Sequence, residues 1–224
     1  MNVVPITYFS DVLCVWAYVA QVRIDAVQAE FGDKVRFEPR FCSVFGDTAR
    51  KIATAWKDRD GYAGFNKHLK HVGTQFPEVP LHPDLWLTVR PASSTSPHLA
   101  LKAVQLLEAA GEAAEGDFDA ATIAFRKAFF VQARDIGRRG VQADILRETG
   151  IDAEAVEALV EDGRAFAALS SDYADADAMH IQGSPSFVLN EGRQKLYGNV
   201  GFRVMEANIA ELLREPVPDQ ASWC

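Results

Sequence analysis

The chain of 224 residues opens with two different hydrophobic periods. Residues 3–9 form an almost unbroken apolar run, the stretch from there to Phe31 is amphipathic, and residues 34–41 alternate strictly between apolar and charged side chains. The first and third segments have the pattern of strands, and the second has that of a helix. We therefore predict a βαβ unit. The second strand of this unit contains Pro39. Because proline has no amide hydrogen, we expect one edge of that strand to lack hydrogen bonds to a neighbouring strand.

From Gly46 to about Met179 nearly all the signals are helical. Pro97 stands at the expected first position of one helix, and an apolar stripe at helical spacing follows it as far as Gly111. The same spacing recurs in three later segments, 118–129, 142–149 and 154–160. Glycines at 150 and 163 are suited to end the last two.

After Pro185 the period returns to two. Segments 186–189 and 193–197, joined by a turn at 190–192, predict a β-hairpin, and residues 202–213 predict a closing helix. The expected fold class is α/β. Its organisation is a βαβ part at 1–45, an all-helical insertion domain at 46–179 and a ββα part at 180–224.

The composition narrows the class of partner. The chain has 23 basic and 31 acidic residues, a net charge of −8, which argues against a nucleic acid or an anionic membrane surface. No apolar run approaches the roughly 20 residues of a membrane span. The N-terminal residues lead straight into the first strand, so we expect no signal peptide. Three cysteines give no disulfide framework, and a reducing cytoplasm fits best.

The segment from Ser10 to Tyr18 reads Ser-Asp-Val-Leu-Cys-Val-Trp-Ala-Tyr and places Cys14 between a strand and the first turn of a helix. Backbone N–H groups and the helix dipole favour a thiolate at such a position, so we expect the pKa of Cys14 to lie below that of a free thiol. The alternative is a small buried hydrophobic residue that happens to follow a strand. Asp11 is either a capping residue or a modifier of that pKa.

This segment resembles the active-site motif of the DsbA-like thioredoxin-fold superfamily, Ser-Asp-Val-x-Cys-Pro-Trp-Cys-Tyr in its FrnE-like branch. Cys14 matches the first cysteine of the motif, and Ala17 stands where the second would be. The stretch is also similar to kappa-class glutathione transferases and 2-hydroxychromene-2-carboxylate isomerases, which carry a serine at the position of Cys14. The resemblance implies a thioredoxin-like fold interrupted by a helical domain, and we expect Trp16 to wall the site.

Further matches run along the chain. Residues 183–188, Gly-Ser-Pro-Ser-Phe-Val, match the Gly-Val-Pro-Thr-Phe loop of the family, whose proline is cis. The resemblance implies that Ser184 and Pro185 face Cys14 and that their backbone groups can pair with an extended thiol substrate. The alternative is a plain turn proline before an edge strand. Segments 90–98 and 129–136 are similar to two further family signatures.

Glutathione-using relatives carry Gly-Asn/Ser-Asp-Arg near the end, where this chain reads Gly-Asn-Val-Gly at 198–201. Asn199 is therefore kept as a candidate thiol-binding residue, while the carboxylate and the arginine are missing. We expect no tightly bound cofactor, with glutathione as the one small-molecule thiol that the resemblance offers. A homodimer is left open.

Other reactive side chains are weaker candidates. Cys42 follows the second strand and is either a resolving thiol for Cys14 or a buried structural cysteine. His68 and His71 stand on an expected helix in a basic surrounding, which favours a solvated helix face over a metal site. His98 either orients a substrate or belongs to the core. Cys224 is assigned no role.

Three functions follow from these residues. The first is a thiol-disulfide oxidoreductase that acts through Cys14 alone, with an outside thiol such as glutathione resolving the mixed disulfide. The second is a glutathione-dependent isomerase or transferase for a small aromatic electrophile. The third is a non-catalytic binding protein that has lost the redox pair. The expected partner is thus a small thiol, disulfide or aromatic molecule.

Overall fold

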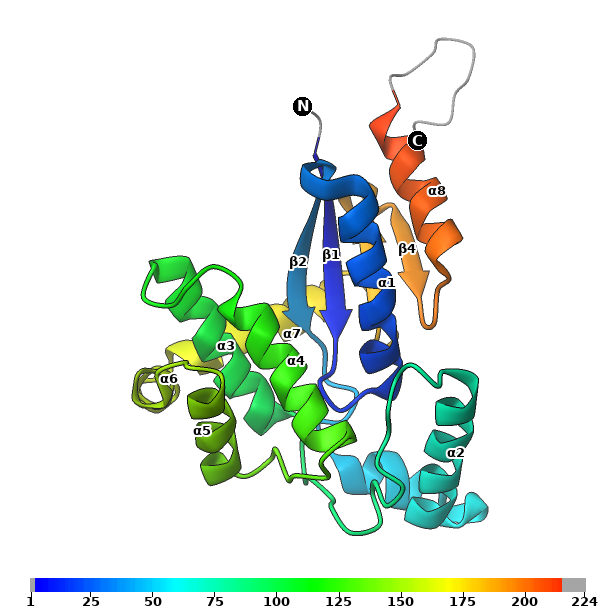
Figure 1. The fold of residues 1–224 in the computed structure, drawn as a ribbon, viewed down its shortest axis with the longest axis vertical. Coiled ribbons are helices and arrows are strands. Elements are labelled where there is room, and N and C mark those ends of the chain that lie inside the picture. The colour runs from blue at the N-terminus through cyan, green and yellow to red at the C-terminus, as the bar shows by residue number, and fades with distance from the viewer. Residues whose placement is uncertain (1–2, 215–224) are drawn as a thin grey trace.

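A computed structural model describes residues 3–214, and Cys224 and the ends of the two expected terminal parts lie outside them. Four strands form one sheet in the order β2-β1-β3-β4 (Figure 1). β1 and β2 are parallel, with Ser10 opposite Phe41 at the end of the ladder, and β3 pairs antiparallel with both β1 and β4. The strands are β1 (Val4–Ser10), β2 (Val35–Phe41), β3 (Ser186–Leu189) and β4 (Gln194–Tyr197).

The predicted strand and helix order is confirmed at both ends of the chain. Helix α1 (Val15–Phe31) connects β1 to β2, and α8 (Phe202–Leu213) closes the described chain. Pro39 lies on an edge strand, because β2 pairs with β1 alone. An edge position is where a residue without an amide hydrogen costs no ladder bond.

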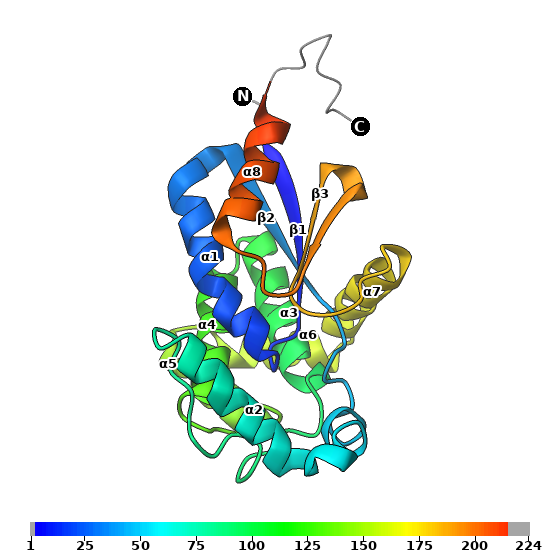
Figure 2. The same cartoon turned by 90° about the vertical axis from the view of Figure 1, so that its right-hand side faces the viewer.

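The two faces of the sheet are covered differently (Figure 2). Ile6 and Tyr8 of β1 pack with Ile24 of α1 and Ile209 of α8 in one apolar cluster. Phe9, which points to the other face, packs with Ala176 of α7 (Arg164–Ala178). Successive residues of a strand point to opposite faces, so β1 is buried on both sides. The thioredoxin-like α/β fold with an inserted helical segment is the fold of this chain.

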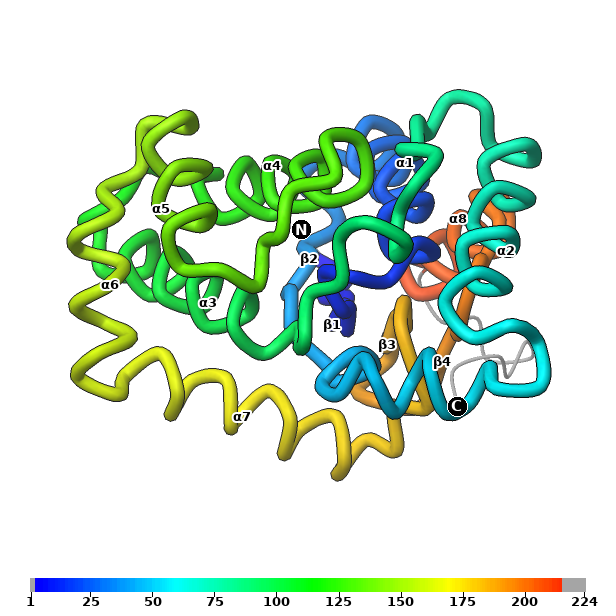
Figure 3. Tube along the Cα trace, turned by 90° about the horizontal axis from the view of Figure 1, so that it is seen from below, coloured from blue at the N-terminus to red at the C-terminus, as the bar shows by residue number. Residues whose placement is uncertain are grey.

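Seen from below, the helical segment between β2 and β3 lies on both sides of the strands, with α3 (Thr95–Ala110) to α6 (Ala153–Glu161) on the left and α2 (Gly61–Gln75) on the right (Figure 3). Helices α3, α6 and α7 pack on one another, and the core of the segment continues without a break into residues at the start of α1. The remaining helices of the segment are η2 (Ala49–Thr54), η3 (Lys57–Arg59), α4 (Asp117–Phe130) and α5 (Arg139–Glu148).

Two expectations for this segment are wrong in detail. Residues 76–94 form turns and loops rather than helix, because four prolines fall among them and each removes an amide donor and clashes with the preceding turn. Pro97 is the third residue of α3 and not the first. This position still lies within the first turn, where helical amides have no partner in the helix. Within residues 3–214 there is no helix of a length and hydropathy that would cross a bilayer.

Candidate active site

Cys14 lies at the junction that the sequence predicts for it. It is the N-cap residue of α1, and its carbonyl oxygen accepts from the amides of Ala17 and Tyr18 at 3.1 Å each. Its side chain is 5% exposed. Ala17 is fully buried one turn further along, where the DsbA-like motif has its second thiol.

The loop before β3 meets Cys14. The Ser184–Pro185 peptide bond is cis, as the resemblance implies, and Cys14 Sγ donates a hydrogen bond to the Ser184 carbonyl oxygen at 3.2 Å. The Ser184 hydroxyl in turn accepts from the amide of Asp11 at 2.8 Å. The Pro185 carbonyl accepts from the amide of Gly198 at 2.9 Å. Asn199 is therefore the next residue after the one that hydrogen-bonds to the cis-proline loop. Segments 170 residues apart are thus joined at one sulfur.

Asp11 ties the loop around Cys14 to two other segments. One carboxylate oxygen accepts from the amide of Leu13 at 2.9 Å, and the other accepts from the amides of Val44 and Phe45 and from the Ser94 hydroxyl, at 2.7 to 3.0 Å. The side chain is fully buried, and burial raises its pKa to about 6 although these hydrogen bonds lower it. Asp11 is therefore not the N-cap residue of α1, but its charge does act on Cys14, since it raises the pKa of that thiol. Asp11 holds the active-site loop in position.

His98 completes this arrangement from α3. It is fully buried, and burial, reinforced by the charge of Arg126, lowers its pKa to about 3, so the ring is neutral. Nε2 accepts from the amide of Val12 at 3.1 Å, which leaves the ring proton on Nδ1, 3.2 Å from the Tyr173 hydroxyl. His98 is a core histidine that supports the loop. The similarity of segment 90–98 to the family pointed to His98 and Ser94, whereas no sequence signal pointed to Tyr173.

The expectation of a lowered pKa for Cys14 is wrong for this conformation. Burial raises the pKa of the thiol, and the negative charge of Asp11 adds to that effect. Contacts with Ser184 and with the amides of Ala17 and Trp16 lower it by less. A protonated thiol agrees with the geometry, because only an S–H can donate to the Ser184 carbonyl oxygen. The dipole of α1 is outweighed because the sulfur is shielded from water.

Cys42 lies near Cys14 but packs in a different cluster. Its side chain is buried against Phe9, Ala176 and Val188, while Cys14 belongs to the core of the helical segment. Burial raises the pKa of Cys42, and the charges of Asp11 and Cys14 act in the same direction. Both thiols are free. These contacts are those of a structural cysteine, and a resolving role stays a prediction.

Trp16 and His68 share an aromatic cluster beside α1. The Trp16 ring packs edge-on against Phe76 at 6.0 Å and lies 6.4 Å from the His68 ring, which also contacts Trp56 and Phe65. His68 is thus half-buried among rings and does not sit on a fully solvated face, although His71 is exposed. The contacts of Trp16 join α1 to α2, and its role as a wall for substrate stays a prediction.

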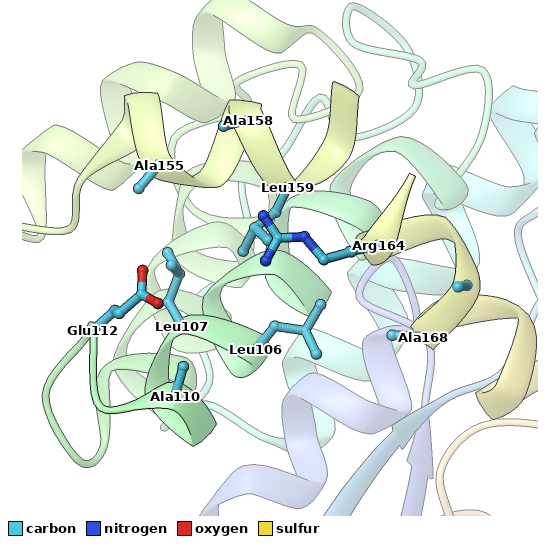
Figure 4. A pocket seen from close by; sticks show the side chains of 10 residues that line it. Leu106, Leu107, Ala110, Glu112, Ala155, Ala158, Leu159, Arg164 and Ala168 are labelled. Carbon is cyan, nitrogen blue, oxygen red and sulfur yellow. The ribbon is translucent and has the colours of Figure 1, made fainter. Parts of the chain in front are cut away.

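A cavity of about 690 Å³ opens within the helical segment, far along the chain from Cys14 (Figure 4). Leucine and alanine side chains from α3, α6 and α7 line it, with Glu112 and Arg164 as its only charged residues. It contains none of the predicted site residues.

The raised pKa of Asp11 predicts a specific pH dependence of stability. The folded-state pKa of about 6 exceeds the usual 3.8, so proton binding favours the folded state, and this contribution is lost as the pH rises through 6. Relative to Asp11→Asn, the free energy of unfolding of the wild type should fall by about 2 kcal/mol between about pH 4.5 and about pH 7. Urea unfolding of both proteins measures this. A difference that does not change with pH would contradict the burial argument.

Comparison with known proteins finds solved structures of the same fold. A probable DsbA oxidoreductase of Streptomyces coelicolor superposes with a TM-score of 0.72 at 20% identity, covering 96% of this chain and 92% of that one. The cytosolic disulfide reductase DsbM of Pseudomonas aeruginosa, solved with GSH, gives a TM-score of 0.66 at 22% identity, covering 94% and 100%. A 2-hydroxychromene-2-carboxylate isomerase gives a TM-score of 0.63 at 17% identity, covering 93% of this chain and 95% of that one.

At these identities the structures show a shared fold. No match was found among curated proteins. The model of the DSBA-like thioredoxin domain matches residues 5–210, from the first strand into the closing helix. The chain therefore belongs to the DSBA-like thioredoxin domain family.

Proposed function

We propose that this protein is a thiol-disulfide oxidoreductase that acts through Cys14 alone. The observation that carries the proposal is the contact of Cys14 Sγ with the Ser184 carbonyl oxygen beside a cis proline, together with an alanine at position 17. A substrate chain that pairs with the backbone of Ser184 would bring its own sulfur to the same place. The family supports thiol chemistry at this position, and Ala17 removes the second thiol of the motif.

The reaction then runs in two exchanges. The Cys14 thiolate attacks one sulfur of a substrate disulfide, an S–S bond forms to the protein, and the other sulfur leaves as a thiolate that takes up a proton. A second thiol from solution, such as glutathione, attacks the mixed disulfide and returns Cys14 to its reduced form. This exchange leaves the second half of the substrate joined to glutathione, and a second glutathione releases it, so that two electrons pass from two glutathione molecules to the substrate disulfide. Such a thiol is abundant in a reducing cytoplasm, which is the compartment we propose.

Because Cys14 is protonated at rest, the first exchange requires a change at the site. A substrate backbone that binds to Ser184 would compete for the carbonyl oxygen that now accepts the S–H. If the Ser184 loop moves away from Cys14, water reaches the sulfur, and burial, the main cause of the raised pKa of Cys14, is removed. We propose that substrate binding and activation of the thiol are coupled in this way.

A second function is favoured by one specific observation. A protonated Cys14 that donates a hydrogen bond resembles the serine of the glutathione-dependent isomerases and transferases more than it resembles a reactive thiolate. In that function Cys14 would donate to the thiolate of bound glutathione and would form no covalent bond. The substrate would be a small aromatic electrophile.

Turnover of a small disulfide by glutathione tests the first function. With 2-hydroxyethyl disulfide as substrate, we expect double-reciprocal plots at several glutathione concentrations to be parallel, because the two exchanges occur separately through a covalent intermediate. Intersecting lines would mean that both molecules bind together, as the second function requires. The absence of turnover in both this assay and an isomerase assay would favour a binding protein.

A further inference from the structure

A second cavity, of about 500 Å³, lies between the sheet and the helical segment. β1, β2 and α1 contribute to it from one side, and α3 and α4 contribute from the other. Its lining includes neither Cys14 nor Ser184, so it is separate from the thiol site. We call it the Arg126 cavity, after the arginine of α4 that contributes to its lining.

Arg126 is a buried cation without a carboxylate partner in the described part of the chain. Only 1% of the residue is exposed. Two of its nitrogens donate to neutral oxygens, Nη1 to Gln21 Oε1 at 3.1 Å and Nη2 to Ser10 Oγ at 3.2 Å, while Nε has no partner. Burying an arginine normally requires an anion beside it, because desolvation of the charge is costly. Within residues 3–214 no carboxylate forms an ion pair with this guanidinium, and Asp119 of the same lining interacts with it only through its charge.

Two further polar groups of the lining have no partner. The Tyr8 hydroxyl, on β1, lies beside the Arg126 guanidinium and Ser10 but makes no hydrogen bond of good geometry. The Thr122 hydroxyl, one helical turn before Arg126, has none either. Among residues 3–214, three of the six buried side-chain atoms without a partner thus belong to this one cavity. All three can donate a hydrogen bond.

We propose that the Arg126 cavity binds a small organic monocarboxylate with an apolar body. A carboxylate at Arg126 would neutralise the charge and accept from Nε and from the hydroxyls of Tyr8 and Thr122, which requires only small side-chain movements. The rings of Phe41 and Phe118 belong to the same lining and offer apolar surface to the remainder of the molecule.

The rim of the cavity limits the charge of the ligand. Four acidic residues line the cavity: Asp33, Glu115 and Asp119 are exposed, and Glu108 is half-buried. These acidic groups would repel a polyanion such as a nucleotide or a free phosphate, while a single carboxylate can pass them and reach the arginine. The site is thus selective for one negative charge on an apolar molecule.

Matched small probes test the proposal on the wild-type protein. We expect 3-phenylpropionate to bind with a Kd of about 1 mM or tighter and to shift the ¹⁵N–H signal of Arg126 Nε. The neutral 3-phenylpropionamide should bind at least tenfold more weakly, and so should inorganic phosphate. Equal affinity for the acid and the amide would overturn the proposal, as would an unmoved Nε signal. Phosphate binding as tight as that of the acid would show a general anion site and would also overturn it.

Two arginine variants complete the test. Arg126→Gln should weaken the binding of 3-phenylpropionate at least tenfold. Arg36→Gln removes an exposed arginine that lines the same cavity and pairs with Glu38, and it should change the affinity less than twofold. The opposite ranking would place the anion at the rim and contradict the proposal. Should Arg126→Gln fail to fold, the acid and amide comparison and the Nε signal still decide the question.

Discussion

Replacing Cys14 with serine is expected to abolish disulfide exchange, with a loss of turnover on the order of 10³-fold or more. The hydroxyl of serine can still donate to the Ser184 carbonyl oxygen, so the loop should keep its place and the free energy of unfolding should change little. What is lost is the sulfur that forms the covalent intermediate. Steady-state turnover of 2-hydroxyethyl disulfide with glutathione measures the effect.

The same variant separates the two proposed functions. In glutathione-dependent isomerases and transferases that resemble this chain, a serine occupies the position of Cys14, so Cys14→Ser should keep that activity. Cys42→Ala is the matched control, because it removes the other described thiol from an apolar cluster to which neither Cys14 nor Ser184 belongs. It should retain turnover within a few-fold. A large loss in Cys42→Ala alone would contradict the single-thiol mechanism.

Restoring the second thiol with Ala17→Cys should have the next largest effect. Residues three apart in a helix have Cβ atoms about 5–6 Å apart, close enough for a disulfide after a small adjustment at the N-terminus of α1. We therefore expect oxidised glutathione to convert this variant to a form with an internal disulfide between Cys14 and the introduced thiol. Insulin-reductase activity should rise at least tenfold over the wild type, because the protein would then resolve its own mixed disulfide.

Ala17 is fully buried, so the added sulfur is expected to cost about 1–3 kcal/mol of stability. Ala17→Ser is the control, because it adds an atom at the same place without redox chemistry. It should show neither the internal disulfide nor the gain in activity. If Ala17→Cys accumulates a glutathione adduct and no internal disulfide, the geometry inferred for the motif is wrong.

The sequence predicted the strands and most helices because their periods are strong and their ends are marked. Gly111, for example, has a φ of 72° at the end of α3, a left-handed conformation that glycine adopts at little cost. The contact between Cys14 and Ser184 could not come from periodicity, since these residues are 170 positions apart. It came from matching two motifs to one family.

Other features depend on three-dimensional burial and could not be predicted from one sequence. The position of Cys14 indicated a lowered pKa, but the depth of the sulfur reverses the direction of the shift. Tyr173 contacts His98 from a helix whose sequence gave no functional signal. Arg126 stands in an ordinary amphipathic helix pattern, and only the structure shows that its charge is buried without a carboxylate.

The intact mass of the wild type after exposure to oxidised glutathione tests the central claim most directly. With one reactive thiol at the site and no sulfur at position 17, we predict a stable adduct of one glutathione on Cys14. Added thiol should reverse it, and the adduct should be absent from Cys14→Ser. A Cys14–Cys42 disulfide formed without any adduct would make Cys42 the resolving thiol and contradict the single-thiol mechanism.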